Sequence, residues 1–579
     1  MKRLWLVSVL GVLLAACAPS ATVPPPLIPT PTPLVLPSTA TPDLVAGGVW
    51  ISPAVPDSLR NVAQGWGIAT NADAKLASLR LDVQSSSQGA ASQWIYALVA
   101  PFPTVLDGVT SDELKAVWKG SSPESFGKWP LLMTESTLAT FTAVWGAPGI
   151  TVRVTPALQL VDAAWEQRPA WAIVPFELIE PRWKVLTVDG QSPVRKDFDA
   201  GKYPLTVNFS VTSTGADTGR FVLPKSNRDP SKLATVIMTG TTALVREIAY
   251  QMEVHGIDYP GSDIGDILRQ ADVLHVSDEV AFDPTCPPPD PNENRFYCSA
   301  PRYIGLFEDV GVDVVELTGN HILDNGEHSL LYTLDWLKQH HMVYFGGGAN
   351  LEDARKVLTM DVNGNKLAFM GCMAAEPPQP LATDHSPGTN PCDYRLMAAE
   401  ILQLRSKGYL PIVTFQYKEG YSPQVMPWQL VDFRKVAAAG AVIVSGSQSH
   451  VPMKMEFFNG AFVHYGLGNL FFGQMGNQPP GPGLPLQPAE RYEFLDRHVF
   501  YDGRYLGTEL LTAMLEDYAR PRPMTDSERA AFLTAYFSYS GWLPFVPTPA
   551  PEQTPTRYPL LQFHPLPTHT PLPKTTPTP

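Results

Sequence analysis

The sequence predicts an α/β protein built from two successive globular domains. Strand-like runs rich in β-branched and apolar residues occur at residues 79–83, 94–99 and 150–154. A helical stretch at residues 112–118 lies between the second and third of these runs, and the same alternation returns in the second half of the chain. Alternating strands and helices are typical of α/β folds. We expect a first domain over residues 43–229 and a second over residues 230–546.

The N-terminus has the pattern of an export signal. Lys2 and Arg3 precede a largely apolar run over residues 4–16, which is shorter than the roughly 20 residues that a membrane-spanning helix needs. The run ends in Leu-Ala-Ala-Cys at residues 14–17, which resembles a bacterial lipobox. The resemblance implies that residues 1–16 are a signal peptide and that Cys17 carries the lipid. The chain would then be exported and anchored at the outer face of the bacterial cell membrane. The alternative for Cys17 is a buried structural cysteine.

Two Pro- and Thr-rich tracts flank the globular part. They cover residues 17–42 and 547–579 and hold many of the 59 prolines of the chain. Such a composition buries no core and favours extended, polyproline-like conformations. We interpret the first tract as a linker above the membrane and the second as a disordered tail.

The first domain resembles the phosphate-type periplasmic substrate-binding proteins. The resemblance depends on five segments, namely YALVAP at 96–101, VTSDELKAVWKG at 109–120, WAIVP at 171–175, LTVDG at 186–190 and YPL at 203–205. The Ser-Gly-rich phosphate loop of that family is missing from this segment. A substrate-binding-protein-like fold is therefore expected, but a phosphate pocket is not supported, and a shortened scaffold is an equal alternative.

The most informative stretch of the second domain covers residues 312–348. Apolar residues at 312, 314, 315 and 317 form a strand that ends in a Thr-Gly turn, so Asn320 and His321 should lie at its carboxyl end. Ligands bind at this end of the strands in open α/β sheets. A helix should follow, because Leu330, Leu334 and Leu337 recur on one face. The Asn-His pair is thus expected between two packed elements.

This stretch and five others resemble the CapA family of capsule and poly-γ-glutamate synthesis proteins. Order and spacing agree from about Thr235 to about Pro523. The matching positions are Thr239-Gly240-Thr241, Ser277-Asp278-Glu279, Gly319-Asn320-His321 with Asp324 and Gly326, Gln416-Tyr417-Lys418, the segment 446–450 and the segment 466–470. The resemblance implies the fold of calcineurin-like metallophosphatases, a four-layer αββα sandwich.

The metal-binding positions of that family are only partly retained. The resemblance assigns metal binding to Glu279, Asn320, His321 and His450, with His321 as the catalytic residue. An expected Asp is replaced by Thr241, and two expected histidines are replaced by Gln416 and Gln448. Two divalent ions about 4 Å apart repel each other strongly and need anionic ligands around them. We therefore expect one weakly held divalent ion, Mn²⁺ or Zn²⁺, or none.

Other residues near this site have competing interpretations. His275 shares a strand face with Ser277 and Glu279, so it is either a substitute ligand or an ordinary histidine packed between sheet and helix. Asn320 and His321 could themselves be a turn asparagine and a hydrogen-bonded histidine. The glycines at 346–348 precede a helix for which Asn350 looks like the N-cap. They form either an anion cradle or a tight strand-to-helix turn.

The cysteines other than Cys17 suit an oxidising exterior. Four remain, and they allow three pairings. Cys286 and Cys298 bracket a Pro-rich loop, which a disulfide would close, and by the same logic we pair Cys372 with Cys392. A zinc knuckle is the alternative, but its CxxC spacing is absent.

The charge of the chain limits its partners. The formal net charge is −14 and the pI is about 5.3, without a basic run to neutralise phosphates, so a nucleic-acid partner is not expected. By resemblance, the function is synthesis or attachment of an extracellular anionic polymer, with that polymer or another cell-envelope component as the partner. Two classes remain open. One is a hydrolase or transferase with a residual metal, and the other is a non-catalytic surface binding protein.

Overall fold

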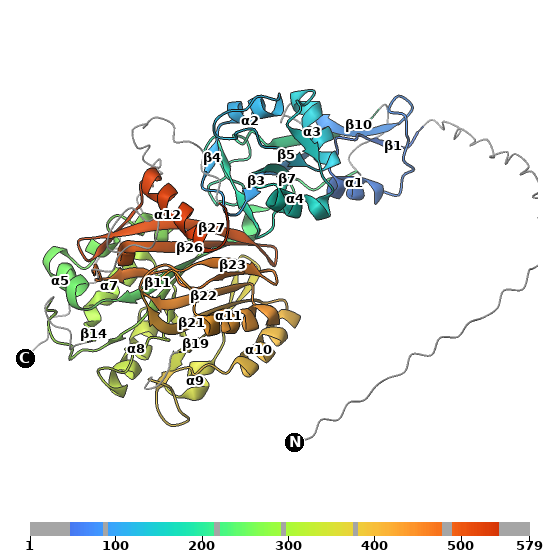
Figure 1. Ribbon diagram of the computed structural model, residues 1–579. Helices are drawn as coiled ribbons and strands as arrows, with labels where there is room; N and C mark the ends of the chain where they lie inside the picture. Colours follow the sequence, from blue (N-terminus) through green and yellow to red (C-terminus); the bar gives the residue numbers. More distant parts are fainter. Residues whose placement is uncertain are drawn as a thin grey trace, which may run out of the picture. The chain divides into compact units, whose positions relative to one another are not determined.

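The computed structural model describes residues 47–84, 91–213, 221–290, 297–374, 380–476 and 489–543 (Figure 1). From Gly47 onward these residues belong to one compact unit. The predicted signal peptide, Cys17, the linker and the tail at 547–579 lie outside the described residues. Within the ranges above, no helix is both long and apolar enough to cross a membrane.

The first sheet is formed by the N-terminal half of the protein. Its strands run in the order β1 (Val49–Ile51), β2 (Leu79–Gln84), β10 (Thr206–Ser213), β3 (Ser92–Pro101), β7 (Trp171–Pro175), β5 (Leu131–Met133) and β6 (Val152–Val154), and β8 (Trp183–Val185) also pairs with β3. A small separate sheet joins β4 (Gly108–Val109) to β9 (Thr187–Val188). The helices are α1 (Asp57–Gln64), α2 (Ser111–Trp118), α3 (Glu135–Trp145) and α4 (Leu160–Glu166). The predicted strands at 79–83, 94–99 and 150–154 correspond to β2, β3 and β6, and the predicted helix corresponds to α2.

Two larger sheets form the C-terminal half. The first has the order β16 (Val343–Phe345), β15 (Val314–Glu316), β12 (Val273–Asp278), β11 (Leu233–Ala243), β26 (Tyr492–Tyr501), β27 (Arg504–Glu516) and β28 (Arg520–Pro523), with β25 (Asn469–Phe472) beside β11. The second has the order β18 (Leu358–Val362), β19 (Asn365–Met373), β21 (Leu410–Gly420), β22 (Ile443–Ser449), β24 (Ala461–His464) and β23 (Met455–Phe458). Short pairs join β13 (Ala281–Phe282) to β14 (Cys298–Ser299) and β17 (Gly347–Gly348) to β20 (Gly388–Thr389).

Helices cover the outer face of each of these two sheets (Figure 1). The β11–β12–β15 sheet packs against α5 (Arg246–His255), α6 (Gly265–Leu268), α7 (Ile304–Val310) and α8 (Glu327–Gln339). The β19–β21–β22 sheet packs against α10 (Tyr394–Ser406) and α11 (Pro427–Ala439). Apolar side chains from the inner faces of both sheets share a third core, which α12 (Asp526–Tyr539) also joins. The protein is thus a mixed α/β protein, and its C-terminal half has a helix–sheet–sheet–helix arrangement.

The helix predicted after His321 is confirmed. Leu330, Leu334 and Leu337 are buried on α8, within the core that this helix shares with β11 and β12. Asn350 caps α9 (Leu351–Arg355), because its side chain accepts a hydrogen bond from the N–H of Asp353. Gly347 and Gly348 form β17, and Gly346 before them has a φ of +80°. A Cβ on Gly348 would lie 2.4 Å from the backbone nitrogen of Ala354, so this strand approaches α9 closely. The role of the glycine run as an anion cradle stays a prediction.

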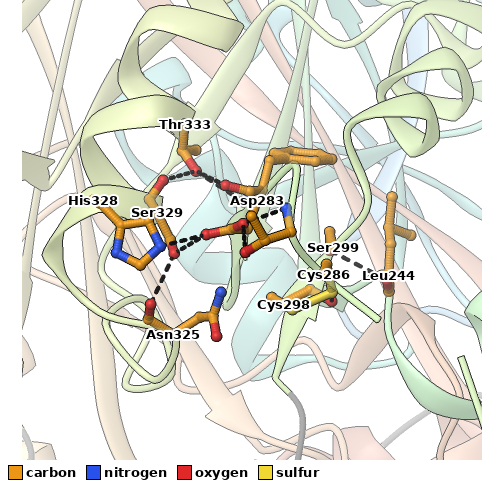
Figure 2. The surroundings of a disulfide bond; sticks show 11 residues. Leu244, Asp283, Cys286, Cys298, Ser299, Asn325, His328, Ser329 and Thr333 are labelled. Carbon is orange, nitrogen blue, oxygen red and sulfur yellow. Dashed lines mark hydrogen bonds and ion pairs between the residues drawn. A yellow bond between two sulfur atoms is a disulfide. The ribbon is translucent and has the colours of Figure 1, made fainter. Parts of the chain in front are cut away.

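Both predicted disulfides are confirmed. Cys286 pairs with Cys298 at a Cα–Cα separation of 5.8 Å, and Cys372 pairs with Cys392 at 5.1 Å. Figure 2 shows the first disulfide beside a buried carboxylate, Asp283, which faces the start of α8. The bridge therefore ties the start of β14 to a loop that Asp283 anchors to the helix after His321.

Candidate functional site

Strand ends place the predicted site residues at one edge of the C-terminal half. β11, β12 and β15 run parallel to one another in one sheet, and β21 and β22 run parallel in the other. The hydrogen bond from Gln448 in β22 to Thr241 in β11 brings the ends of the two sets together. Thr241 lies near the end of β11, Gln416 lies in β21 and Gln448 lies in β22. Residue 279 directly follows β12, and Asn320 with His321 follow β15 by four and five residues. For Asn320 and His321, this position beyond the strand end agrees with the sequence prediction.

Two glycines allow these strand ends to approach closely. A Cβ on Gly319 would lie 2.5 Å from the backbone of Glu279, and one on Gly240 would lie 2.1 Å from the carbonyl oxygen of Gly468. Only glycine fits at such contacts. The first contact brings the Asn-His segment against Glu279, where Val280 and His321 form an isolated parallel β-bridge. The second lies where the register between β11 and β12 shifts, just before Thr241.

The residues that replace the expected metal ligands form a hydrogen-bonded series, which we call the amide chain. The N–H of Gln448 donates to Oγ1 of Thr241 over 3.1 Å. Nε2 of Gln416 donates to Oε1 of Gln448 and, over 3.2 Å, to Oδ1 of Asn320. Thr241, Gln416 and Gln448 are all buried. The three neutral residues at the expected ligand positions are therefore hydrogen-bonded to one another.

Two features hold the amide chain in place. Oγ of Ser447 donates to Oε1 of Gln416 over 2.6 Å, which leaves Nε2 of that amide as the donor to its neighbours. Gln448 has a φ of +72°, in the left-handed region that non-glycine residues rarely adopt. Such residues cost on the order of 1 to 3 kcal/mol and cluster at functional sites. The local backbone is therefore held by its surroundings, including the bond to Thr241.

His321 is a partly exposed ionisable group of the site. Its side chain is 29% exposed, and Nδ1 lies 2.6 Å from Oδ2 of Asp324. The ring stacks on Tyr297, with centroids 4.3 Å apart and planes 11° from parallel. Burial alone would lower the pKa of His321, but the bond to Asp324 and the charge of Glu279 raise it overall. Because Asp324 occupies Nδ1, Nε2 is left for a ligand or a proton.

His450 lies in a separate, buried environment. Its Nδ1 lies 2.9 Å from Oδ1 of Asn469, whose amide in turn donates to the His450 carbonyl over 3.3 Å. The ring contacts Phe472 at 4.7 Å and Tyr421 at 5.5 Å between centroids. Among the described residues, no hydrogen bond joins His450 to His321. Thr241 pairs with Asn469, the partner of His450, across β11 and β25. Because Thr241 also belongs to the amide chain, it links His450 to Asn320, which precedes His321.

Glu490 is a site neighbour that sequence reasoning missed. It is buried, and burial raises the pKa of its carboxyl, although the nearby His450 acts in the opposite direction. The residue lies just before β26, which runs antiparallel to β11 and is far from His450 in sequence. No motif marks it, so the sequence contained no signal for it.

The described residues do not fit a two-metal centre. Within the described ranges, no group of three or more His, Cys, Asp or Glu side chains is placed to hold one ion. Glu279 is buried with Oε1 lacking a hydrogen-bond partner there, and the amides of Gln416 and Gln448 bond to each other. Among the described residues, the site therefore lacks the carboxylates and imidazoles that two neighbouring metal ions need as ligands. The roles of Glu279, Asn320, His321 and His450 as ligands of a single ion stay predictions.

His275 is a core residue. Its Nε2 lies 3.3 Å from Oε2 of Glu316, and both side chains are almost fully buried. The ring lies against Phe345 and, from the other sheet, Phe369. We expected His275 to pack between a sheet and a helix. It packs instead between the two facing sheets, because Phe345 and Phe369 come from different sheets.

The chain is similar in sequence to known capsule proteins. Residues 235–474 match the family model described as bacterial capsule synthesis protein PGA_cap. Capsule biosynthesis protein CapA of Bacillus anthracis is 24% identical over 277 residues, which cover 47% of this chain and 67% of that protein. PGA biosynthesis protein CapA of Bacillus subtilis (strain 168) is 26% identical over 172 residues, which cover 30% of this chain and 45% of that protein. The match thus spans from about half to two thirds of these relatives.

Solved structures show weaker likenesses. A 5'-nucleotidase precursor from Thermus thermophilus covers 53% of this chain and 58% of its own, with 15% identity and a TM-score of 0.32. An ABC-type phosphate transport receptor from Vibrio cholerae covers 30% of this chain and 91% of its own, with 10% identity and a TM-score of 0.26. These scores are low, so the assignment depends on the sequence match. Over residues 235–474, this chain is similar to the bacterial capsule synthesis proteins of the CapA type.

Proposed function

We propose that the protein serves the synthesis or attachment of an extracellular anionic polymer, such as capsule or poly-γ-glutamate, and that its candidate site binds the polymer without hydrolysing phosphoesters. The family match supports the polymer. The amide chain of Thr241, Gln448, Gln416 and Asn320 carries the second part of the proposal. It occupies the positions where the family resemblance expects metal ligands.

Chemical reasoning supports binding over hydrolysis. Two-metal hydrolysis needs ions that activate water, and anionic ligands must offset the repulsion between those ions. Neutral amides supply dipoles only, and here Gln416 and Gln448 satisfy each other. Losing even one supporting partner of a metal ligand typically lowers metal affinity about 10- to 100-fold. One Mn²⁺ or Zn²⁺ held weakly by Glu279, Asn320, His321 and His450 is the most that this site would retain.

The remaining parts of the proposal concern architecture and location. We assign the C-terminal half to the four-layer metallophosphatase type and residues 43–229 to a substrate-binding-protein-like domain without a phosphate loop. Lipid attachment at Cys17 would hold both at the outer face of the cell membrane. These assignments place the candidate site where an extracellular polymer is assembled.

A second candidate function is a hydrolase or transferase that uses His321. One observation favours it. His321 is partly exposed, bonded at Nδ1 to Asp324, and has a raised pKa, as a general acid or base requires. In that case Asp324 would orient the ring and Nε2 would exchange the proton.

One experiment separates the two functions. The full chain in detergent is tested for calorimetric binding of poly-γ-glutamate, with a neutral polysaccharide as control, and for Mn²⁺-dependent hydrolysis of p-nitrophenyl phosphate. Saturable polymer binding without turnover supports the proposal. Turnover that His321→Ala abolishes and His340→Ala retains would establish the second function. His340 is a suitable control because its Nδ1 also bonds to a carboxylate, Glu308, at 2.7 Å. If the protein shows no polymer binding and no turnover, both functions are overturned.

A further inference from the structure

Arg246 lies at the candidate site in an unusual backbone conformation. It is the first residue of α5 and follows the end of β11 by three residues, close to Thr241. Its φ of +50° lies in the left-handed region, although no glycine is present. Non-glycine residues adopt this conformation only where their surroundings impose it. The backbone therefore turns sharply at Arg246, between β11 and α5.

The guanidinium of Arg246 connects the aromatic neighbours of both site histidines. Its Cζ lies 5.5 Å from the ring centroid of Tyr297 and 5.8 Å from that of Phe472. Tyr297 stacks on His321, and Phe472 packs against His450. Both distances are within the range of cation–π contacts. The guanidinium thus contacts one aromatic neighbour of each histidine.

The hydrogen-bonding capacity of Arg246 is almost unused. Its side chain is only 18% exposed, and among the described residues Nε has no hydrogen-bond partner. The nearest carboxylate, Glu247, lies 3.9 Å from Nε, beyond hydrogen-bond distance. Arg434, by contrast, donates two bonds to Glu456, at 2.7 Å and 2.5 Å. A mostly buried guanidinium with free donors is costly unless an acceptor from outside completes it.

We infer that Arg246 is the residue that binds carboxylate at the candidate site, taking one carboxylate group of the polymer beside His321. This inference deepens the proposed function, on which it rests, by naming the chemical class that the site recognises. The planar fork of arginine matches the two oxygens of a carboxylate. A dianionic phosphate matches the site less well, because Glu279 and Asp324 already lie near His321 and would repel it more strongly.

The test uses histidine NMR on the full chain in detergent. The His321 signal, assigned by its loss in His321→Ala, is followed while acetate, a γ-linked glutamate tetramer or inorganic phosphate is added. We expect saturable shifts with the two carboxylate probes. Arg246→Gln should weaken them by about tenfold or more, as loss of a hydrogen bond to a charged group does. Arg246→Lys should bind at an intermediate level, because the charge remains but the fork is lost.

Two controls make the test specific. Arg168 also lies over an aromatic ring, Trp165, at 4.8 Å, and its Nε also lacks a hydrogen-bond partner among the residues that the structure describes. Arg168 resembles Arg246 in these two respects but belongs to the N-terminal half, between α4 and β7. Arg168→Gln should therefore leave probe binding unchanged. The pKa of His321 should rise in Arg246→Gln, since the positive charge of Arg246 lowers it in the native protein. That rise shows that the variant is folded and that the two residues are neighbours.

The outcomes separate this inference from the proposed function. Shifts by acetate that require Arg246, without any binding of the glutamate tetramer, would support the inference and contradict the polymer function. Equal acetate binding by Arg246→Gln and the native protein would overturn the inference. No shift by any probe in the native protein would overturn it as well, and a response to phosphate alone would replace carboxylate as the ligand class.

Discussion

Two polar regions of this protein treat charge in opposite ways. One is the candidate site, and the other, which we call the ion-pair cluster, joins β27 and α12 to segments of the N-terminal half. Its members are Asp107, Lys184, Arg195, Arg497, Glu509 and Arg529. Asp107 accepts from Arg529 at 2.7 and 2.9 Å and lies 2.7 Å from Lys184. Glu509 accepts from Arg195 at 2.5 Å and from Arg497 at 3.0 Å.

The contrast appears in the acid groups of each region. Burial would raise the pKa of Glu509, but Arg195 and Arg497 outweigh it and lower the pKa to about 2. At the candidate site, Asp278 has no cationic partner among the described residues, and burial raises the pKa of this group well above the usual range. Compensated charges stabilise the fold, whereas groups left without partners are suited to a ligand.

The largest expected effect is at the ion-pair cluster. Glu509→Gln should lower the free energy of unfolding by about 3 kcal/mol at pH 7, because two mostly buried arginines lose their anion. The pKa of Glu509 is lowered by folding from 4.5, so its contribution is present above that pH and disappears as the pH falls towards about 2. Urea unfolding at several pH values measures this. Glu180→Gln, at a more exposed pair with Arg182, is the control, and an equally small effect of both would contradict the comparison.

Removal of each disulfide should distinguish stability from site structure. Cys286→Ser/Cys298→Ser and Cys372→Ser/Cys392→Ser should each lower the free energy of unfolding by about 2 to 3 kcal/mol. Only the first pair adjoins Tyr297, which stacks on His321. The His321 NMR signal should therefore move in the first variant and stay in the second. A shift of equal size in both would show that Tyr297 is not positioned by its neighbouring bridge.

Two buried aspartates near the site should respond with opposite signs. Burial would raise the pKa of Asp283, but bonds from Ser329 and Thr285 lower it to about 2. Figure 2 shows Ser329 beside this carboxylate. Asp283→Asn should cost about 2 kcal/mol at pH 7, and the loss should vanish as the pH falls from 3.8 towards 2.

Asp278→Asn is the matched substitution. Because the folded pKa of Asp278 is raised, the native protein loses stability as the pH rises above 3.8, where the unfolded chain ionises. The variant should therefore be more stable than the native protein at pH 7 and equal to it in acid. Urea unfolding of both variants across this pH range decides the matter. A loss at Asp278 as large as that at Asp283 would mean that Asp278 is ionised and paired.

The smallest stability effect is expected at His321. Asp324→Asn should change the free energy of unfolding by about 0.5 kcal/mol or less, because the pair is partly exposed. The pKa of His321 should fall, since Asp324 helps to raise it. Its raised pKa contributes stability that is present below the unfolded value of 6.5 and lost as the pH rises through the folded value. An NMR titration in which the pKa stays constant would remove Asp324 as its partner.

Sequence reasoning succeeded where local patterns determine structure. The spacing of Leu330, Leu334 and Leu337 identified the buried face of α8, and the Thr-Gly turn after the predicted strand placed Asn320 and His321 just beyond the end of β15. Loop closure was enough to pair the cysteines, because each pair brackets a short segment.

It failed where partners come from distant segments. The strand period placed His275 correctly on one face, but its neighbour Phe369 belongs to the facing sheet. No sequence pattern marked Arg246 as a site residue, because its contacts are with Tyr297 and Phe472, which are far from it in the chain. Glu490 lies near His450 only after β26 has joined β11. Such contacts depend on tertiary packing and leave no periodicity in the sequence.

Metal binding tests the central claim most directly. The full chain is dialysed against Mn²⁺ or Zn²⁺ and its metal content is measured beside that of Thr241→Asp/Gln416→His/Gln448→His, which restores the ligand types of the family. We expect the native protein to hold either metal substoichiometrically and to lose it on further dialysis, and the triple variant to retain more. Stoichiometric, tightly held Mn²⁺ or Zn²⁺ in the native protein would contradict the claim that the amide chain has replaced a metal centre.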